Sequence, residues 1–148
     1  MFSRKLLTIS VLLLVFVAIF LFFSQQKEIK EVIVRDKTFS VEVARTRTEL
    51  ERGLSLHIPL LNDQGMLFVF TKEDFHDIWM KDMLFPIDVL WIDSNLRIIY
   101  MEKSILPDSY PKIFSPETKN LYVLEIPSGQ VDFLNIKIGD KVKFVKSS

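Results

Sequence analysis

Three charged residues lie inside apolar stretches of the sequence and are the first candidates for chemistry. Lys81 and Asp88 belong to the run WMKDMLFPIDVLWID, and Glu125 belongs to LYVLEIP. A charge among apolar side chains is costly unless it is paired or opens onto a pocket. Because side chains alternate across a strand, Lys81 would share a face with Trp79, and each carboxylate would point into an apolar layer. We therefore predict that Lys81 pairs with Asp88, Glu125 or both at one end of the fold.

Two interpretations of this charged cluster stay open. The first is a structural ion pair that fixes strand register, or simple placement at solvated strand ends. The second is a pocket with Trp79 at its floor, in which Lys81 holds an anionic group of a small ligand and a carboxylate orients it. The same residues could also serve a small enzyme, with Lys81 and either Asp88 or Glu125 as an acid–base pair.

Histidines and a tyrosine supply the remaining candidates. Asp74 and His76 have the i, i+2 spacing of a metal pair, but no third ligand is identified, so the sequence predicts neither a metal nor a cofactor. Tyr110 lies in a long, proline-rich stretch of the kind that often forms binding loops. The predicted ligand-binding set is Trp79, Lys81, Asp88, Glu125, His57 and Tyr110.

Two short helices are predicted among the elements that position these residues. Thr46 and Glu49 fit a capping box, which predicts a helix over residues 47–52 that ends at a left-handed Gly53. Its leucines should face a sheet. Ser128 is predicted to cap a second short helix that runs to residue 133.

The rest of the domain is predicted to consist of strands. The β-branched, alternating pattern of VIVRD and TFSVEVA predicts a first hairpin, and further apolar runs separated by turn residues follow. These elements do not alternate in the βαβ manner. They indicate a mainly β fold, either an antiparallel β-sandwich or a flattened barrel, with one or two short helices. The further predicted strands are GMLFVF, HDIWMKD, PIDVLWID, RIIYMEK, LYVLEIP and KVKFV.

The N-terminus carries an apolar stretch that is distinct from this domain. Residues 6–23 contain only two polar side chains across roughly 18 residues, close to the length that spans a bilayer. Phe22 and Phe23 stand where a signal peptide would need small residues, which favours an uncleaved anchor over a cleaved signal. Arg4 and Lys5 precede the stretch and predict that the N-terminus stays in the cytoplasm.

This pattern divides the chain into three parts and predicts its location. We expect a single-pass protein of the cell membrane whose C-terminal domain lies outside the cytoplasm, in the periplasm or outside the cell. The parts are a signal anchor over residues 1–26, a short stalk over 27–31 and a β-rich domain over 32–148.

Charge and cysteine content exclude several function classes. Beyond Lys5 the chain has 17 basic and 19 acidic residues with the signs interspersed, which gives no basic surface for nucleic acid. The chain has no cysteine, which excludes disulfides, thiolate metal sites and thiol nucleophiles. An exported domain of this size must therefore be stabilised by packing.

Four motifs carry a resemblance to a known family. ERGLSLHIPLLNDQGMLFVF, WMKDMLFPIDVLWID, LYVLEIPSG and IKIGDKV occur in the order and spacing of the uncharacterised proteins called domain of unknown function 192, which the sequence resembles over residues 32–145. The resemblance implies an exported or membrane-anchored β-rich domain with no established reaction. The family pattern matches Gly53, Leu54, Trp79, Met80, Lys81, Pro86, Asp88, Glu125, Gly129 and Gly139.

The sequence departs from that family pattern at two places. Where many members carry an arginine shortly after the glycine–leucine pair, the nearest residue here is His57. The loop over residues 104–120 has none of the cysteines that some members carry there. A function that rests on that arginine or on those cysteines is therefore not expected of this chain.

These features together predict a small-ligand-binding or accessory module of the cell envelope, and they favour binding over catalysis. The alternatives are a small lyase or hydrolase that acts on an envelope polymer, or a structural partner in a membrane complex. In the last case the loop around Tyr110 would be the contact surface. The predicted partners are the membrane and either a small ligand or an envelope protein, without nucleic acid.

Overall fold

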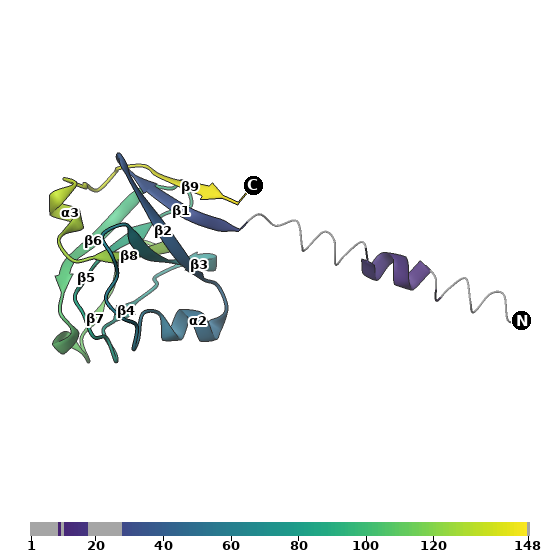
Figure 1. The fold of residues 1–148 in the computed structure, drawn as a ribbon, viewed down its shortest axis with the longest axis horizontal. Helices are drawn as coiled ribbons and strands as arrows, with labels where there is room; N and C mark the ends of the chain where they lie inside the picture. Colours follow the sequence, from purple (N-terminus) through teal and green to yellow (C-terminus); the bar gives the residue numbers. More distant parts are fainter. Residues whose placement is uncertain (1–8, 10, 18–27, 148) are drawn as a thin grey trace, which may run out of the picture. The chain divides into compact units, whose positions relative to one another are not determined.

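The computed structural model describes residues 9, 11–17 and 28–147, and Ile29–Lys146 form one compact unit within it. Mainly β structure is confirmed, with nine strands in this unit and few short helices (Figure 1). The strands are β1 Ile29–Val34, β2 Lys37–Ala44, β3 Gln64–Asp74, β4 Ile78–Trp79, β5 Ile87–Ile92, β6 Ile98–Ile105, β7 Ile113–Phe114, β8 Asn120–Pro127 and β9 Val142–Lys146. The helices are α2 Arg47–Arg52, α3 Gln130–Phe133 and the 3₁₀ turn η1 Pro107–Ser109.

The predicted membrane anchor falls largely outside the described residues. Of the stretch over residues 6–23, the structure describes 9 and 11–17, which are helical with exposed side chains. Within the described parts of the chain, no helix has the length and apolar character needed to cross a membrane. The anchor, and with it the boundary at residues 26 and 27, therefore stays a prediction.

Seven strands form one sheet in the order β6-β5-β8-β3-β2-β1-β9. All neighbours in it are antiparallel except β2 and β3, which run parallel. The two edges meet at one end, where Arg97 and Lys141 form an antiparallel bridge and the Val142 N–H donates to the Leu96 carbonyl at 2.8 Å. The sheet is thus mostly antiparallel, as predicted from the sequence. β4 and β7 form a separate two-stranded ribbon.

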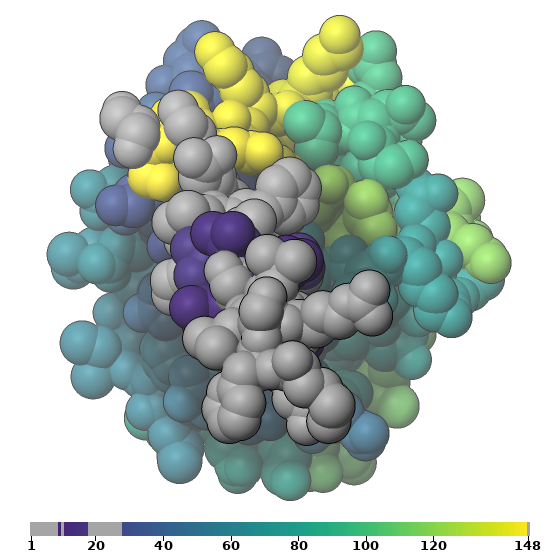
Figure 2. All heavy atoms as spheres, turned by 90° about the vertical axis from the view of Figure 1, so that its right-hand side faces the viewer, coloured from purple at the N-terminus to yellow at the C-terminus, as the bar shows by residue number. Residues whose placement is uncertain are grey.

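β9 pairs with β1 in antiparallel orientation. Figure 2 shows the C-terminal residues in yellow beside blue residues of the first hairpin, in agreement with the register that places Lys143 opposite Ile33. The hairpin was predicted from its residue pattern, and the antiparallel pairing of Val32 with Phe39 confirms it. The last strand thus extends the first hairpin at an edge of the sheet.

Apolar side chains pack on both faces of the sheet, in two clusters. Figure 1 places α2, β4 and β7 together at the lower end of the domain and α3 at the upper left. The α2-side cluster is Ala44, Leu54, Met66, Phe68, Ile78, Met80, Met83, Phe85, Ile87, Val89, Trp91, Ile105, Phe114 and Val123. The α3-side cluster is Ile29, Val32, Val34, Phe39, Leu67, Leu90, Ile92, Ile98, Leu124, Ile126, Val131, Ile136 and Val142.

Helix α2 forms as its capping residues predict. The Thr46 hydroxyl accepts from the Glu49 N–H at 3.3 Å, and the Glu49 carboxylate accepts from the Thr46 N–H at 2.9 Å. Backbone N–H groups of Arg45 and Thr46 hold the pKa of Glu49 below its usual range, because they stabilise the charged form. Gly53 ends the helix with φ of +48°, and Leu54 packs into the α2-side cluster as predicted.

Two local predictions are wrong. The segment HDIWMKD is not a full strand, because only Ile78 and Trp79 pair, and Lys81 and Asp82 form a turn in which Asp82 has φ of +57°. The residue that precedes α3 is Gly129, not Ser128, whose hydroxyl donates instead to the Ser104 hydroxyl at 2.9 Å. The turn removes Lys81 from the strand face on which the predicted ion pair depended.

Candidate functional site

Asp88 is a buried structural residue whose carboxylate is bound by backbone groups. It lies on β5 and accepts from the Ser104 N–H at the end of β6 and from the Val131 N–H in α3, both at 2.8 Å. Hydrogen bonds from two backbone donors compensate a carboxylate for the water it has lost. Asp88 therefore joins three elements on the face of the α3-side cluster.

Glu125 lies on the other face of the sheet. In the register of β5 with β8, Glu125 stands opposite Val89, whereas Asp88 stands opposite Ile126. Directly opposite residues in paired strands share a face, so Glu125 points toward the α2-side cluster, to which Val89 belongs. The two carboxylates are on opposite faces and cannot share one cation.

Lys81 pairs with neither carboxylate. Its side chain is exposed in the turn that follows β4, and no ion pair within the described part of the chain includes it. Its backbone carbonyl accepts from the Ser55 hydroxyl at 2.8 Å, which ties this turn to the segment after α2. The predicted pairing of Lys81 is therefore wrong, and the charged cluster separates into an exposed lysine and two independent acids.

Glu125, in contrast to Asp88, is a buried acid whose charge no hydrogen-bond donor at Oε2 and no ion pair among the described residues compensates. The residue is 4% exposed, and its Oε2 has no hydrogen-bond partner. Burial raises the pKa of Glu125 to about 8, because an apolar environment disfavours the charged carboxylate. At neutral pH the side chain is thus mostly a protonated carboxyl group, which can donate a hydrogen bond as well as accept one.

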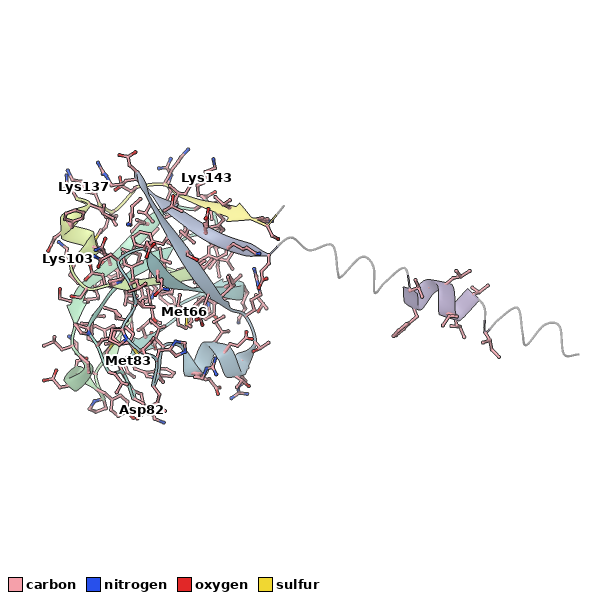
Figure 3. The ribbon with its side chains drawn as sticks, viewed as in Figure 1. Met66, Asp82, Met83, Lys103, Lys137 and Lys143 are labelled. Carbon is pink, nitrogen blue, oxygen red and sulfur yellow. The ribbon has the colours of Figure 1, made fainter. Side chains whose placement is uncertain are left out.

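A small cavity of about 40 Å³ opens in front of Glu125 and is here called the Glu125 cavity. Its walls come from α2 and the residues after it, from β3, and from the segment around β4. Met83 lines this cavity, and Met66 stands opposite Glu125 in the pairing of β3 with β8. Figure 3 shows Met83 below Met66. The lining residues are Leu50, Glu51, Arg52, Gly53, Leu54, Ser55, Phe68, Asp77, Ile78, Trp79, Met83 and Glu125.

A larger groove of about 420 Å³ adjoins this cavity and is here called the Trp79 groove. Six residues line both spaces, namely Leu50, Glu51, Phe68, Asp77, Ile78 and Trp79. Arg45, Arg47, Phe70, Thr71, Phe75 and His76 complete the groove. Two of its aromatic side chains are accessible, because Trp79 is 40% and Phe75 53% exposed.

The Trp79 groove carries charges of both signs. Arg47 binds Glu51 at 2.7 Å, so these two residues largely neutralise each other. Arg45 and Asp77 have no such partner among the ion pairs of the described residues. The groove thus combines an aromatic surface with one cation and one anion, and leads to the acid in the Glu125 cavity.

The other predicted site residues lie elsewhere. His57 is half-buried in the turn after α2, where its backbone N–H donates to the Leu54 backbone carbonyl at 3.1 Å. Tyr110 is 49% exposed and follows η1. Neither residue lines the Glu125 cavity or the Trp79 groove. Of the predicted set, the structure therefore brings together Trp79 and Glu125 alone.

The two residues considered as a metal pair make other contacts. Asp74 binds Lys72 at 3.2 Å, and the His76 ring stacks on Phe70 with centroids 3.5 Å apart. His76 Nε2 lies 3.1 Å from the Lys72 carbonyl. Among the described residues, no group of three or more acidic or histidine side chains could hold a metal ion.

Several groove residues were not found by sequence reasoning. His76 and Asp77 belong to the segment HDIWMKD, which was predicted as one strand, and Phe75 lies just before it, so the irregular backbone that places these three residues at the groove was not anticipated. Arg45, in the groove, lies shortly before the predicted helix, and Arg52, in the Glu125 cavity, is its last residue, so the predicted helix ends were the available signal for both. Only the distant pairing of β3 with β8 brings Phe68 and Glu125 together, and that register is not evident from the residue pattern.

Relatives with solved structures share this fold. A Novosphingobium aromaticivorans protein of unknown function is similar with a TM-score of 0.74 and 28% identity, over 80% of this chain and 87% of that one. A Sinorhizobium meliloti protein named a "putative transcription regulator" is similar with a TM-score of 0.72 and 28% identity, over 77% of this chain and 90% of that one.

Two curated relatives carry a name that assigns no function. A UPF0127 protein of Thermococcus sibiricus is 31% identical over 108 residues, which is 71% of this chain and 66% of the relative. A UPF0127 protein of Thermococcus gammatolerans is 31% identical over 106 residues, which is 70% of this chain and 65% of the relative. The aligned part thus spans just under two thirds of each of these relatives.

The family resemblance noted in the sequence is also confirmed. The profile of the family DUF192, described as "Uncharacterized ACR", matches residues 27–144. That range contains strands β1 to β8, the first three residues of β9, and every residue that lines the Glu125 cavity and the Trp79 groove. The chain therefore belongs to the DUF192 family.

Proposed function

We propose that the β domain binds a small polar molecule in the Trp79 groove, with one group of that molecule reaching Glu125. The observation that carries this proposal is a buried carboxyl group with an unpartnered oxygen at the inner end of an accessible aromatic groove. A polar group without a partner lowers stability, and a ligand group that supplies the partner removes that cost. Ligand sites commonly combine apolar walls with a few polar groups in this way.

The geometry also favours one form of the enzymatic alternative. Lys81 with Asp88 cannot act as an acid–base pair, because one is exposed and the other is held by backbone on the opposite face. Glu125 and Asp77 instead line one cavity. A carboxyl group with a pKa of about 8 is suited to donate a proton near neutral pH, so a Glu125 acid with Asp77 as base is the enzyme to test against simple binding.

The proposed setting of this module is the cell envelope. The apolar stretch over residues 6–23 supports a single-pass anchor that leaves the domain outside the cytoplasm, and no nucleic acid is involved. The exposed Leu106, Tyr110 and Ile113 would then be available to an envelope protein as a contact surface. Alkaline extraction of membranes tests the anchor, because an integral protein stays in the pellet after the wash.

The binding proposal is tested by ligand-induced stabilisation of the full chain. Sugars, amino acids, amines, nucleotides and short peptides are added, and the thermal midpoint is recorded together with the NMR signal of the Trp79 indole. A compound that binds only the folded state raises the midpoint, by an amount that corresponds to about 2.7 kcal/mol at a hundred times its Kd. Turnover of the same compounds is followed to detect the enzymatic alternative.

A matched pair of aromatic variants tests whether the ligand that shifts the thermal midpoint binds in the Trp79 groove. Trp79→Ala should abolish the midpoint shift, whereas Tyr110→Ala should keep it, because both side chains are comparably exposed but only Trp79 lines the groove. Binding that survives in Trp79→Ala would place the ligand elsewhere. If no compound perturbs the indole signal or the midpoint, the groove is not a small-molecule site.

A further inference from the structure

We propose that the ligand group entering the Glu125 cavity is a protonated amine, and that its binding ionises Glu125 and releases the carboxyl proton to solvent. This inference rests on the proposed function of the groove. It names the chemical class of the group that reaches the inner end, and it makes binding depend on pH in a defined direction.

The first support is that no ion pair among the described residues compensates the charge of Glu125. Its Oε2 is buried and unpartnered, and within the described residues no lysine, arginine or histidine forms an ion pair with it. A buried carboxylate is stable only when a cation or several hydrogen-bond donors compensate its charge. An ammonium group supplies both, since it carries a positive charge and three N–H donors.

The second support is the wall of the Glu125 cavity. Leu50, Leu54 and Met83 offer no hydrogen-bonding side chain, while Phe68 and Trp79 offer aromatic rings. An ammonium group is attracted to the face of such a ring, most strongly where water is excluded. The volume of about 40 Å³ suits a compact head group of a few non-hydrogen atoms.

The other charged groups around this cavity must be compared with Glu125 as possible partners of an incoming cation. Glu51 and Arg52 from α2 and Asp77 before β4 line the same space. On the flanking strands, apolar Met66 and Val89 stand opposite Glu125. Glu51 already has Arg47 at 2.7 Å, and Asp77 is exposed to solvent, so Glu125 is the buried acid whose charge an incoming cation would compensate.

The proton balance follows from these positions. The free protein holds Glu125 as a carboxyl group at neutral pH, and the amine arrives as an ammonium ion. In the complex the ammonium faces a carboxylate, and one proton has left for solvent, with no covalent bond to carbon formed or broken. A ligand hydroxyl or carbonyl would instead bind to the protonated carboxyl group and release no proton.

Butylamine, butan-1-ol and butanoate are matched probes for this inference, because they differ only in the terminal group. Each is titrated into the full chain at pH 6, 7, 8 and 9 in buffers without a primary amine, and the Kd is taken from the Trp79 indole signal. We expect butylamine to bind most tightly. Its Kd should fall about tenfold per pH unit below pH 8 and level off above it, as release of one proton requires.

Two substitutions test whether Glu125 or Asp77 causes the pH dependence of butylamine binding. Glu125→Gln should abolish both the preference for the amine and the slope with pH, since an amide cannot ionise. Asp77→Asn, an acid-to-amide change on the same cavity, should keep the slope. A ¹³C label in the glutamate side-chain carboxyls reports the ionisation of Glu125 directly in the complex, and Glu125→Asp provides a second carboxyl variant if Glu125→Gln does not fold.

The outcomes separate this inference from the proposed function. If butan-1-ol or butanoate binds more tightly than butylamine, or butylamine binds without a slope in pH, the inference is wrong while the groove remains a ligand site. If the slope disappears in Asp77→Asn and persists in Glu125→Gln, the wrong acid has been assigned and the inference fails. If none of the three probes moves the indole signal and the broader compound panel is also without effect, the proposed function itself fails.

Discussion

At the scale of single residues, the burial of Glu125 should be visible in the stability of the protein. An acid with a raised pKa in the folded protein binds its proton more tightly there than in the unfolded chain, so stability falls as pH rises. The loss should begin above the ordinary pKa of 4.5 and be complete near the folded-state value of about 8. Glu125→Gln removes this titration.

We therefore expect Glu125→Gln to be more stable than the natural protein at pH 7 by on the order of 3 kcal/mol, and nearly equal to it at pH 4. Urea unfolding at pH 4, 5, 6, 7 and 8 measures the difference. Asp77→Asn, an exposed acid on the same cavity, is the control and should follow the natural protein. Parallel stability curves for the natural protein and Glu125→Gln would show that Glu125 is not buried as a neutral acid.

Residue patterns alone identified Asp88 and Glu125 as buried charges, but they did not show that the two carboxylates lie on opposite faces of the sheet. Alternation within a strand gives the face of a side chain relative to its own neighbours, and both assignments of this kind were correct. Which faces of two strands coincide depends on their register, and Val89, not Asp88, stands opposite Glu125. A shift of one residue in register exchanges the faces, and the sequence has no local signal for it.

At the scale of elements, the capping box of α2 should contribute both to stability and to the shape of the groove. Thr46→Ala removes the side-chain acceptor for the Glu49 N–H and should lower the free energy of unfolding by about 1 kcal/mol. Because α2 lines both the Glu125 cavity and the Trp79 groove, the same substitution should also weaken any ligand bound there.

Thr48→Ala is the matched control for this change. Thr48 is exposed on the same helix and takes no part in the capping box. Urea unfolding should place Thr48→Ala within about 0.5 kcal/mol of the natural protein. If both variants lose stability equally, the loss arises from threonine-to-alanine replacement in general and the cap is unimportant.

Local signals explain which elements were predictable. The first hairpin, α2 and the turn before β6 have their own residue signals and formed as expected. The segment around Lys81 has apolar residues in a strand-like pattern, but Met80 and Met83 enter the α2-side cluster from a turn rather than from a strand. Packing of these methionines is a tertiary effect, and it overrides the local preference for an extended chain.

At the scale of the whole molecule, the order of the seven strands could not be read from the sequence. The parallel pairing of β2 with β3 and the meeting of Arg97 with Lys141 join segments that no local turn connects. These long-range pairings give one sheet two packed faces, so β2, β3, β5 and β8 each contribute side chains to both the α2-side and the α3-side cluster. We therefore expect both clusters to unfold together in one cooperative transition.

Leu124→Ala tests this cooperativity. Leu124 is fully buried in the α3-side cluster, whereas the adjacent Val123 and the fluorescent Trp91 belong to the α2-side cluster. Truncation of a buried leucine should lower the free energy of unfolding by about 2–5 kcal/mol. Because the sheet is shared, the urea midpoint reported by Trp91 fluorescence should fall by the same amount as the midpoint reported by far-ultraviolet circular dichroism, with little change in slope. A fluorescence midpoint that stays in place while the dichroism midpoint falls would show instead that the face carrying Glu125 and its groove is stable independently of the opposite face.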